Sequence, residues 1–301
     1  MNARLTVVSN VPVADRPPAQ SFQERVAAWA ERSLILEIET WPKPGLVSHV
    51  DAGSHTDMDA DTFKRSALAL RPYFAALVDA GMHNASMTTL RKIGLRAEHA
   101  MLSATGGVNT HRGAIFGVGL LCAAAGLREA GLVYADEALG TVVKRRWGRE
   151  ILAGPRLPDS HGEMAGARYG AGGARQEAAQ GFPSVYEVGL PALHDAQHIA
   201  PGEHEAARVQ ACFSLIAAVE DTNLLHRGGA EGLRFAQQAA RDFLDRGGVG
   251  DPAWQVRAER IHRAFVGRRL SPGGAADLLA MSVFAMELER RPSHHSTAEM
   301  A

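Results

Sequence analysis

The stretch AIFGVGLLCAAA, residues 114–125, decides the fold of this chain because it is apolar on nearly every side. A helix that is apolar all round is buried by its surroundings instead of lying on a protein surface. No apolar run in the chain reaches the length that a bilayer requires. We therefore expect a central helix that begins near Ala114 and is packed on all sides by other helices.

Helical periodicity continues along most of the rest of the chain. Val26, Ala30 and Leu34 mark one face of a helix over residues 21–40, and alternating strand patterns are nearly absent. The sequence therefore predicts an all-α fold, a single-domain multi-helix bundle whose active site is built from helix-end loops. Further helices are expected around residues 63–74, 93–102, 134–152, 204–220, 231–245, 252–267 and 274–289.

Both ends of the chain differ from this helical centre. Residues 1–20 hold three prolines and little periodic pattern, so we expect a flexible N-terminal arm there. Residues 291–301 have the same character and predict a flexible C-terminal tail. The all-helical catalytic domain is expected between them, over residues 21–290.

The overall charge excludes partners that need a strong electrostatic field. The chain of 301 residues has a formal net charge of −1, so we expect neither nucleic acid nor a membrane surface as a partner. Cys122 and Cys212 lie in apolar helical surroundings, which suit reduced core thiols better than a disulfide or a metal site. Residues 1–13 hold one arginine and no apolar core of signal-peptide length. These features predict a cytoplasmic protein.

The segment NTHRG, residues 109–113, directly precedes the central helix. The N–H groups at a helix N-terminus, together with the helix dipole, favour an anion. Arg112 and His111 add charge and hydrogen-bond donors there, so the segment predicts a pocket for a phosphorylated ligand. The alternative is an ordinary helix start, with Thr110 as the N-cap and Arg112 in solvent.

The loop that follows the first helix carries a second group of polar residues. Prolines on both sides of Lys43 stiffen the backbone, so Lys43 and the nearby Ser48 would be presented in a fixed place. His55 and Asp57 could contact a metal ion or a sugar hydroxyl. The alternative is a stiff connector in which one of the aspartates of this loop caps the next helix.

A glycine-rich segment, residues 170–173, precedes Arg175 and Glu177. Glycines allow a backbone to approach a ligand closely, and the two charged residues would then offer a phosphate clamp and an acid–base group. The alternative is a flexible surface loop.

Two further segments carry oxygen ligands and glycines. Asp221 and Asn223 are hard ligands of the kind that Mg²⁺ accepts alongside substrate phosphates, unless Asp221 is a solvated residue at a helix C-terminus. The segment SPGG, residues 271–274, opens a helix that carries Asp277, which makes it either an anion site or an ordinary capped helix.

Taken together and in order, these motifs resemble those of the triphosphoribosyl-dephospho-CoA synthase family, over about residues 21–289. Arg112 stands where a lysine is expected from that family, and the charge is kept. The segments that carry the resemblance are PKPGLVS (42–48), HTDM (55–58), GVNTHRGAIF (107–116), GAR (173–175), GFP (181–183), DTN (221–223) and SPGG (271–274).

The resemblance implies a particular reaction. ATP would donate its whole 5-triphosphoribosyl group to the ribose 2′-hydroxyl of 3′-dephospho-CoA, and adenine would leave. The product would be the precursor of the prosthetic group on an acyl carrier subunit, either of malonate decarboxylase or of citrate lyase. The length and the Ala- and Arg-rich composition of the chain resemble the malonate decarboxylase branch more.

The chemistry of this reaction suggests roles for the residues of the loops. Carboxylates can stabilise positive charge on a sugar while its glycosidic bond breaks, and a base must take the proton of the 2′-hydroxyl. We expect Glu177 as this base, with Glu39 as the second choice, and His111 as an acid for adenine.

The triphosphate is not cleaved, so it needs only Mg²⁺ and cationic groups. For Mg²⁺ we expect Asp57, Asp221 and Asp277 as ligands. For the phosphates we expect Lys43, Arg112, Arg175, Arg227 and the backbone at Gly273 and Gly274. Other contacts to the two substrates are expected from Gly45, Ser48, His55, Asn109, Thr110, Gly113, Asn223, Gly228 and Ser271.

Two other functions stay open at this point. One is a Mg²⁺-dependent N-glycoside hydrolase that resembles ADP-ribosylglycohydrolases, in which water replaces the 2′-hydroxyl acceptor. The other is a non-catalytic helical adaptor for an acyl-carrier assembly, which would have no reason to gather polar groups in five loops. The sequence also leaves the oligomeric state open, with a homodimer among the alternatives.

Overall fold

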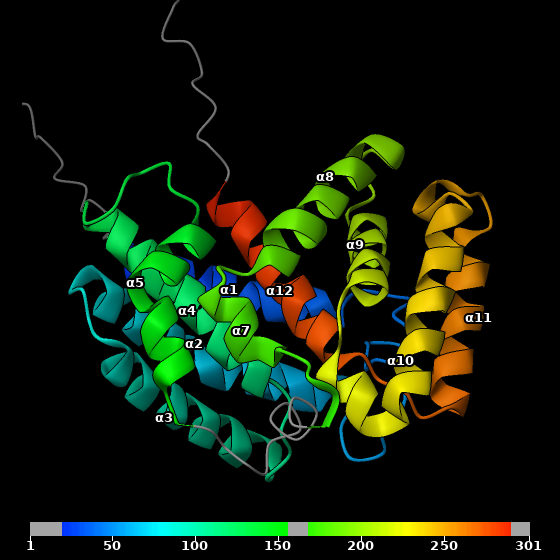
Figure 1. Ribbon diagram of the computed structural model, residues 1–301, viewed down its shortest axis with the longest axis horizontal. Helices are drawn as coiled ribbons and strands as arrows, with labels where there is room; N and C mark the ends of the chain where they lie inside the picture. The colour runs from blue at the N-terminus through cyan, green and yellow to red at the C-terminus, as the bar shows by residue number, and fades with distance from the viewer. Residues whose placement is uncertain (1–19, 156–167, 290–301) are drawn as a thin grey trace, which may run out of the picture.

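The computed structural model describes residues 20–155 and 168–289. These two stretches are helical and contain no β-strand (Figure 1), which confirms the predicted all-α, single-domain fold. The predicted arm, except its last residue, and the predicted tail over 291–301 lie outside the described residues. No helix among the described residues is both long and apolar enough to cross a bilayer.

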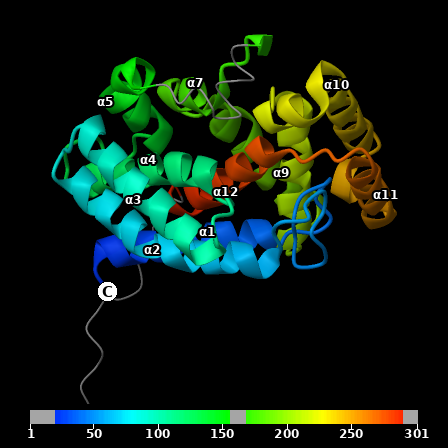
Figure 2. The same ribbon diagram turned by 90° about the horizontal axis from the view of Figure 1, so that it is seen from below.

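Two helices that are buried on every side form the centre of the bundle. The first is α4 (Arg112–Glu129), which is buried at each position from Gly117 to Leu127. The second is α12 (Gly273–Leu288), which is buried at each position from Leu278 to Ala285. They pack against each other and lie in the middle of the molecule (Figure 2). The prediction of a buried central helix over residues 114–125 is therefore confirmed.

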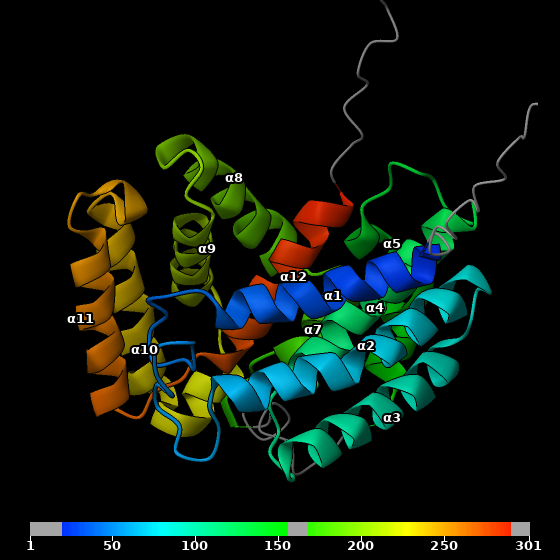
Figure 3. The ribbon, with the colours of Figure 1, turned by 180° about the vertical axis from the view of Figure 1, so that it is seen from behind.

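Three helices from the N-terminal third cover one side of this centre. They are α1 (Phe22–Ile38), α2 (Ala60–Met82) and α3 (Met87–Thr105), and α2 packs on α1, α3 and α4 (Figure 3). The start of α2 is fixed by Asp59, whose Oδ1 accepts the N–H of Thr62 at 2.8 Å. An aspartate of the preceding loop therefore does cap this helix.

The remaining helices cover the other side of the centre and one end of the molecule (Figure 1). η1, α8 and α9 pack against α12, α5 and α7 pack against α4, and α10 and α11 pair at one end. Their bounds are α5 (Leu139–Ala153), α7 (Gly173–Ala179), the π-helix η1 (Ser184–Gly189), α8 (Leu190–Ile199), α9 (His204–Ala218), α10 (Thr222–Asp245), the 3₁₀ turn η2 (Gly248–Gly250) and α11 (Trp254–Gly267).

The structure corrects the sequence prediction for two segments. Residues 170–183, expected as a loop, contain the helix α7, which packs on α5. Residues 221–229, also expected as a loop, form the first turns of α10, and the backbone leaves helical geometry only at Gly229 (φ 60°, ψ −164°). In both cases packing overrides the local preference of glycine for irregular backbone. The helices η1 and α8 were not expected at all.

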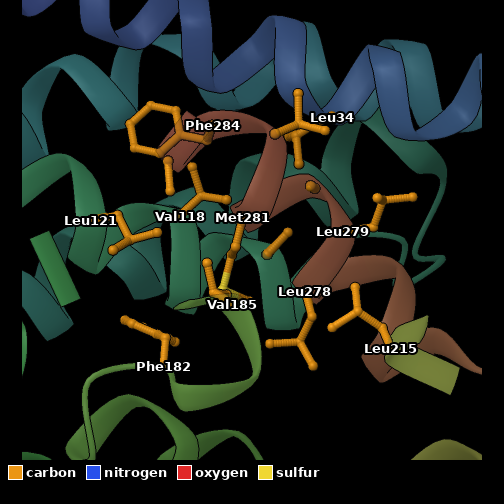
Figure 4. Packing of buried hydrophobic residues seen from close by; sticks show 14 of the residues in the cluster. Leu34, Val118, Leu121, Phe182, Val185, Leu215, Leu278, Leu279, Met281 and Phe284 are labelled. Carbon is orange, nitrogen blue, oxygen red and sulfur yellow. The ribbon is translucent and has the colours of Figure 1, made fainter. Parts of the chain in front are cut away.

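Side chains from distant parts of the chain meet in the core (Figure 4). Leu34 from α1, Val118 from α4, Leu215 from α9 and Phe284 from α12 are buried together in one cluster. Both cysteines are buried and form no disulfide, as predicted. The helices are therefore held by one continuous apolar core, and the loops at their ends are free to carry the chemistry.

α2 and α4 approach each other closely because glycine stands where they cross. A Cβ atom added at Gly126 would overlap the carbonyl oxygen of Val78, and one added at Gly81 would overlap the carbonyl oxygen of Ala123. Gly94 in α3 is different, because a Cβ there meets no atom within 4 Å. Replacement by alanine should therefore lower the stability of the protein at Gly126 and raise it at Gly94.

We expect Gly126→Ala to lower the free energy of unfolding by about 1–3 kcal/mol, as overpacked cores do. Gly94→Ala should raise it by about 0.5–1 kcal/mol, because alanine loses less backbone entropy in a helix. Urea unfolding of the two variants beside the parent protein measures both values. A loss of stability in both, or in neither, would contradict the close crossing of α2 and α4.

Candidate active site

A cavity of about 920 Å³ is lined by parts of α3, α4, α7, α10 and α12, and by the loop before α2. Its volume lies in the upper range of small-molecule sites. It gathers most of the residues that the sequence predicts for the site, namely His55, Asp57, Asn109, Thr110, His111, Arg112, Gly113, Arg175, Glu177, Asp221, Asn223, Arg227, Ser271, Gly273, Gly274 and Asp277.

Asp221 joins the N-termini of two helices in the wall of this cavity. Its Oδ1 accepts the N–H groups of Asn223 at 2.8 Å and Leu224 at 3.3 Å, both in α10. Its Oδ2 accepts the N–H of Ala275 in α12 at 2.9 Å, and the residue is only 1% exposed. The alternative of a solvated residue at a helix C-terminus is therefore wrong, because Asp221 is an N-cap.

Asp277 accepts a backbone hydrogen bond at the N-terminus of the central helix α4. Its carboxylate accepts the N–H of Ala114 at the start of α4, and a Cβ on Gly113 would overlap that carboxylate. The helix terminus that the sequence predicts as an anion site therefore already faces an anionic side chain. Thr110 is not its N-cap: the cap position is His111, and the Asn109 side chain accepts the N–H of Arg112 at 3.1 Å.

Two buried carboxyl groups act on a third in this wall. Burial raises the pKa of Asp277 well above its ordinary value, and the charges of Glu37 and Asp221 raise it further. Burial also raises the pKa of Glu37 and of Asp221. Lys43 forms a buried ion pair with Glu37, so this part of the cavity wall is acidic.

Glu177 also lines the cavity and lies in the second half of α7. Its carboxylate accepts the N–H of Ser184 at 2.7 Å and the Ser184 hydroxyl at 3.1 Å. Burial raises the pKa of Glu177, although the two bonds from Ser184 oppose this shift. A carboxylate with a raised pKa is a stronger base in its ionised form.

Three arginines at the cavity are anchored by protein oxygens. The Arg112 Nε donates to Glu98 at 2.7 Å, and the Arg175 Nη2 donates to three carbonyl oxygens at the end of α5, at 2.7–3.0 Å. Arg227 donates to two loop carbonyl oxygens at 3.3 Å. These bonds fix the guanidinium groups around the cavity, and a guanidinium carries five N–H donors in all.

The loop before α2 and the N-terminus of α12 form the rest of the rim. His55 Nε2 lies 3.0 Å from the Ser271 hydroxyl, and burial followed by the charge of Arg227 lowers the pKa of His55. The Asp57 carboxylate is 61% exposed and lies 3.5 Å from His55 Nδ1. A Cβ on Gly273 would come within 2.9 Å of the Asn223 amide, so glycine is required for this approach.

Comparison with known proteins identifies the family of the chain. The model of the family described as CitG: ATP:dephospho-CoA triphosphoribosyl transferase matches residues 23–296, which include every segment that lines the cavity. The chain belongs to this family.

Relatives of the family cover nearly the same length. Proteins named "Probable 2-(5''-triphosphoribosyl)-3'-dephosphocoenzyme-A synthase" match with 40% identity in Stutzerimonas stutzeri (88% of this chain, 92% of the relative) and with 41% identity in Azotobacter vinelandii (90% and 94%). The relative from Acinetobacter calcoaceticus is 36% identical (88% and 91%). No solved structure gives a significant match. Membership of this transferase family makes the chain an enzyme and argues against the adaptor hypothesis.

Five residues predicted for this transferase site lie outside the cavity lining: Glu39, Lys43, Gly45, Ser48 and Gly228. Glu39 is the C-cap of α1 and pairs with an exposed arginine of its own helix at 3.1 Å. Ser48 accepts two N–H groups of its own loop, at 3.1 and 3.4 Å. Gly45 and Gly228 pack against the segment just before α12, where a Cβ would collide. These residues shape the loops, and Lys43 reaches the cavity only through Glu37.

The surroundings of His111 bear on the hypothesis that it acts as an acid for adenine. Burial, followed by the charge of Lys43, lowers the pKa of His111 to about 3. The imidazole is therefore neutral near pH 7, and an imidazolium that could protonate adenine is not available there. Its Nδ1 lies 2.6 Å from the Ser66 hydroxyl.

Sequence reasoning missed Glu37, Ser66 and Ser184. A signal existed for Glu37, because it lies three residues after Leu34 and shares the apolar face of α1, where a charged residue is out of place. Ser66 and Ser184 carry no such signal, because small polar residues are common in helices and turns.

Residues 20–155 and 168–289 contain no group of three or more His, Cys, Asp or Glu side chains arranged to hold a metal ion. Asp221 and Asp277 share the acidic wall, whereas Asp57 pairs with His55 at the rim. The three predicted ligands therefore do not converge. A Mg²⁺ ion that arrives with substrate phosphates needs only one or two carboxylates from a protein.

Asp277→Asn should make the stability of the ligand-free enzyme less dependent on pH. The folded pKa of Asp277 lies above the unfolded value, so the folded state holds more protons between these two values, and stability falls as pH rises through that window. Asparagine does not titrate, so the stability of the variant relative to the parent protein should increase from pH 4 upward. We expect about 2–4 °C in Tm at pH 8, which corresponds to about 1 kcal/mol.

Thermal unfolding in EDTA between pH 4 and pH 8 measures this difference, with the exposed Asp242→Asn in α10 as the control. A variant whose Tm follows that of the parent protein at every pH would argue against the repulsion among the three carboxyl groups.

Proposed function

We propose that this protein transfers the 5-triphosphoribosyl group of ATP to the ribose 2′-hydroxyl of 3′-dephospho-CoA and releases adenine. The bond from ribose C1′ to adenine N9 breaks with its electron pair leaving on adenine, and a bond from C1′ to the 2′-oxygen of the acceptor forms. The observation that carries the proposal is the coincidence of the family motifs with one cavity, which has an acidic wall and a separate carboxylate, Glu177.

The acidic wall would stabilise the reacting sugar. As the bond to adenine breaks, positive charge develops on the ribose, and nearby carboxylates favour such a charge. Asp221 and Asp277 are held rigidly by backbone N–H groups, so they need no rearrangement when the charge appears.

Glu177 would take the proton of the 2′-hydroxyl. It lines the cavity from α7, whereas Asp221 lies at the start of α10 and Asp277 in α12. The two hydrogen bonds from Ser184 fix the orientation of the carboxylate. Arg112, Arg175 and Arg227 would bind phosphates of the two substrates.

We also propose Mg²⁺ as the ion that accompanies ATP. The acidic wall fits a divalent cation, because among the described residues Asp277 faces the charges of two further carboxyl groups, Glu37 and Asp221, and Lys43 is paired with Glu37. Asp221 and Asp277 would hold the ion, and Asp57, which pairs with His55 at the rim, would not take part. The ion would neutralise the triphosphate beside these carboxylates.

We infer that the product serves as the prosthetic-group precursor for the acyl carrier subunit of malonate decarboxylase. The length and composition of the chain support this branch, and citrate lyase is the alternative. Disruption of the gene should abolish growth on malonate and spare growth on citrate; the reverse result would assign the chain to the citrate lyase branch.

A measurement of adenine release tests the proposed reaction. The enzyme is incubated with ATP and Mg²⁺, with and without dephospho-CoA. Release that requires dephospho-CoA supports the transferase. Equal release without the acceptor would instead support the N-glycoside hydrolase, in which water attacks the ribose.

A further inference from the structure

A chain of three hydrogen-bonding side chains reaches from the cavity wall into the core. The Thr110 hydroxyl donates to Ser66 Oγ at 2.8 Å, and Ser66 Oγ lies 2.6 Å from His111 Nδ1. Ser66 and His111 are buried, at 0% and 3% exposed. No role in the reaction has yet been given to Ser66.

The direction of these bonds fixes the tautomer of His111. Ser66 Oγ accepts a hydrogen from Thr110, and His111 Nδ1 is its one other hydrogen-bond partner among the described residues, so the buried Ser66 hydroxyl satisfies its own hydrogen by donating it to Nδ1. Nδ1 is then an acceptor, and a neutral imidazole carries only one N–H. The hydrogen of the ring must therefore be on Nε2.

His111 Nε2 has no hydrogen-bond partner among the described residues. A buried N–H without a partner lowers the stability of the free protein. A ligand that accepts this hydrogen removes that cost, and the gain adds to the free energy of binding. The ring lines the cavity together with Phe63, which meets it edge-on with ring centroids 4.9 Å apart.

The surroundings of His111 favour a neutral, flat ligand over a phosphate. Phe63 covers one side of the ring, and Met101 Sδ lies 3.2 Å from the backbone nitrogen of His111. A phosphate would favour an imidazolium, whereas burial and Lys43 both oppose that charge. A ring nitrogen of a purine is a neutral acceptor of matching shape.

We propose that His111 donates a hydrogen bond from Nε2–H to a ring nitrogen of a bound purine, and that Ser66 and Thr110 are positioning residues that fix this tautomer. The inference rests on the proposed function, which supplies two purines: the adenine that leaves ATP and the adenine of dephospho-CoA. The hydrogen bond would assist the leaving adenine in the first case and orient the acceptor in the second.

Analogues that lack one ring nitrogen identify the purine and the atom. The kcat/KM values of ATP, 3-deaza-ATP and 7-deaza-ATP are compared in the parent protein and in His111→Ala, and the same comparison is made with deaza analogues of dephospho-CoA. In the parent protein, we expect one analogue to have a kcat/KM about tenfold to a hundredfold below that of the natural substrate. In His111→Ala, the same analogue and the natural substrate should have equal kcat/KM values. The comparison between the two proteins removes the intrinsic reactivity of each analogue.

An equal analogue-to-natural ratio in both proteins, for all four analogues, would overturn the proposal. If the parent protein releases no adenine even with ATP and dephospho-CoA, the proposed function fails instead, and the tautomer is still decided by the next measurement.

¹⁵N NMR of the histidine rings in the ligand-free protein tests the tautomer directly. We expect His111, assigned by its absence in His111→Ala, to show a protonated Nε2 and an unprotonated Nδ1. Thr110→Val should mix the two tautomers and lower kcat, whereas Thr110→Ser should restore both. A protonated Nδ1 in the parent protein, or a Thr110→Val spectrum that is unchanged, would overturn the positioning role.

Discussion

Lys43→Met will lower the free energy of unfolding by about 3–5 kcal/mol, because it leaves the Glu37 carboxylate buried without its cation. Lys43 is 0% exposed and Glu37 is 5% exposed. Glu37 is largely shielded from water in the folded protein, and burial already raises its pKa. Urea unfolding at pH 7 measures the loss.

Two further variants separate the buried charge from the lost side chain. The double variant Lys43→Met/Glu37→Leu removes both charges and should recover most of the stability, as apolar replacements of buried ion pairs do. Arg32→Met breaks an exposed ion pair with Glu39 and should change stability by about 1 kcal/mol or less. A double variant that is no more stable than Lys43→Met would show that Glu37 is not the source of the loss.

Glu177→Gln should lower kcat by about 10²–10⁴-fold, the contribution typical of a positioned base. Glutamine has nearly the same shape and keeps an oxygen that can accept the N–H of Ser184, so the folded structure should change little. The rate of adenine release at saturating ATP and dephospho-CoA measures the effect. Glu129→Gln, an exposed position at the end of α4, is the matched control and should stay within about twofold of the parent rate.

The pH dependence of the parent enzyme gives a second check on Glu177. Burial raises the pKa of Glu177, and a base acts only when ionised, so kcat/KM should fall as the pH drops through this raised value. The acid limb should be absent in Glu177→Gln. A variant that keeps more than a tenth of the parent rate, with the same acid limb, would remove Glu177 from this role.

The sequence predicts the centre of this fold well because burial leaves a direct mark on composition. The run over 114–125 is apolar at every angle around a helix, and only a fully enclosed helix tolerates that pattern. The short helices α7 and η1 leave no such mark. Their segments are rich in glycine or too short for a clear period, and packing against α5, α9 and α12 decides their conformation.

The site could be predicted as a set of residues but not as an arrangement. Asp221 and Ala275, 54 positions apart, are joined by a hydrogen bond, and Asp277 meets the start of α4. No local sequence pattern predicts contacts between residues so far apart in the chain. The choice of Glu39 over Glu37 shows the same limit at short range, because two positions along a helix turn a side chain from the core to the solvent.

The most direct test of the central claim is mass spectrometry of the product. The enzyme is given dephospho-CoA, Mg²⁺ and ATP that is labelled with ¹³C in the ribose. We expect one product that contains dephospho-CoA joined to the labelled ribose with all three phosphates, and an equal amount of unlabelled adenine. Unchanged dephospho-CoA beside free labelled ribose triphosphate, or beside intact ATP, would contradict it.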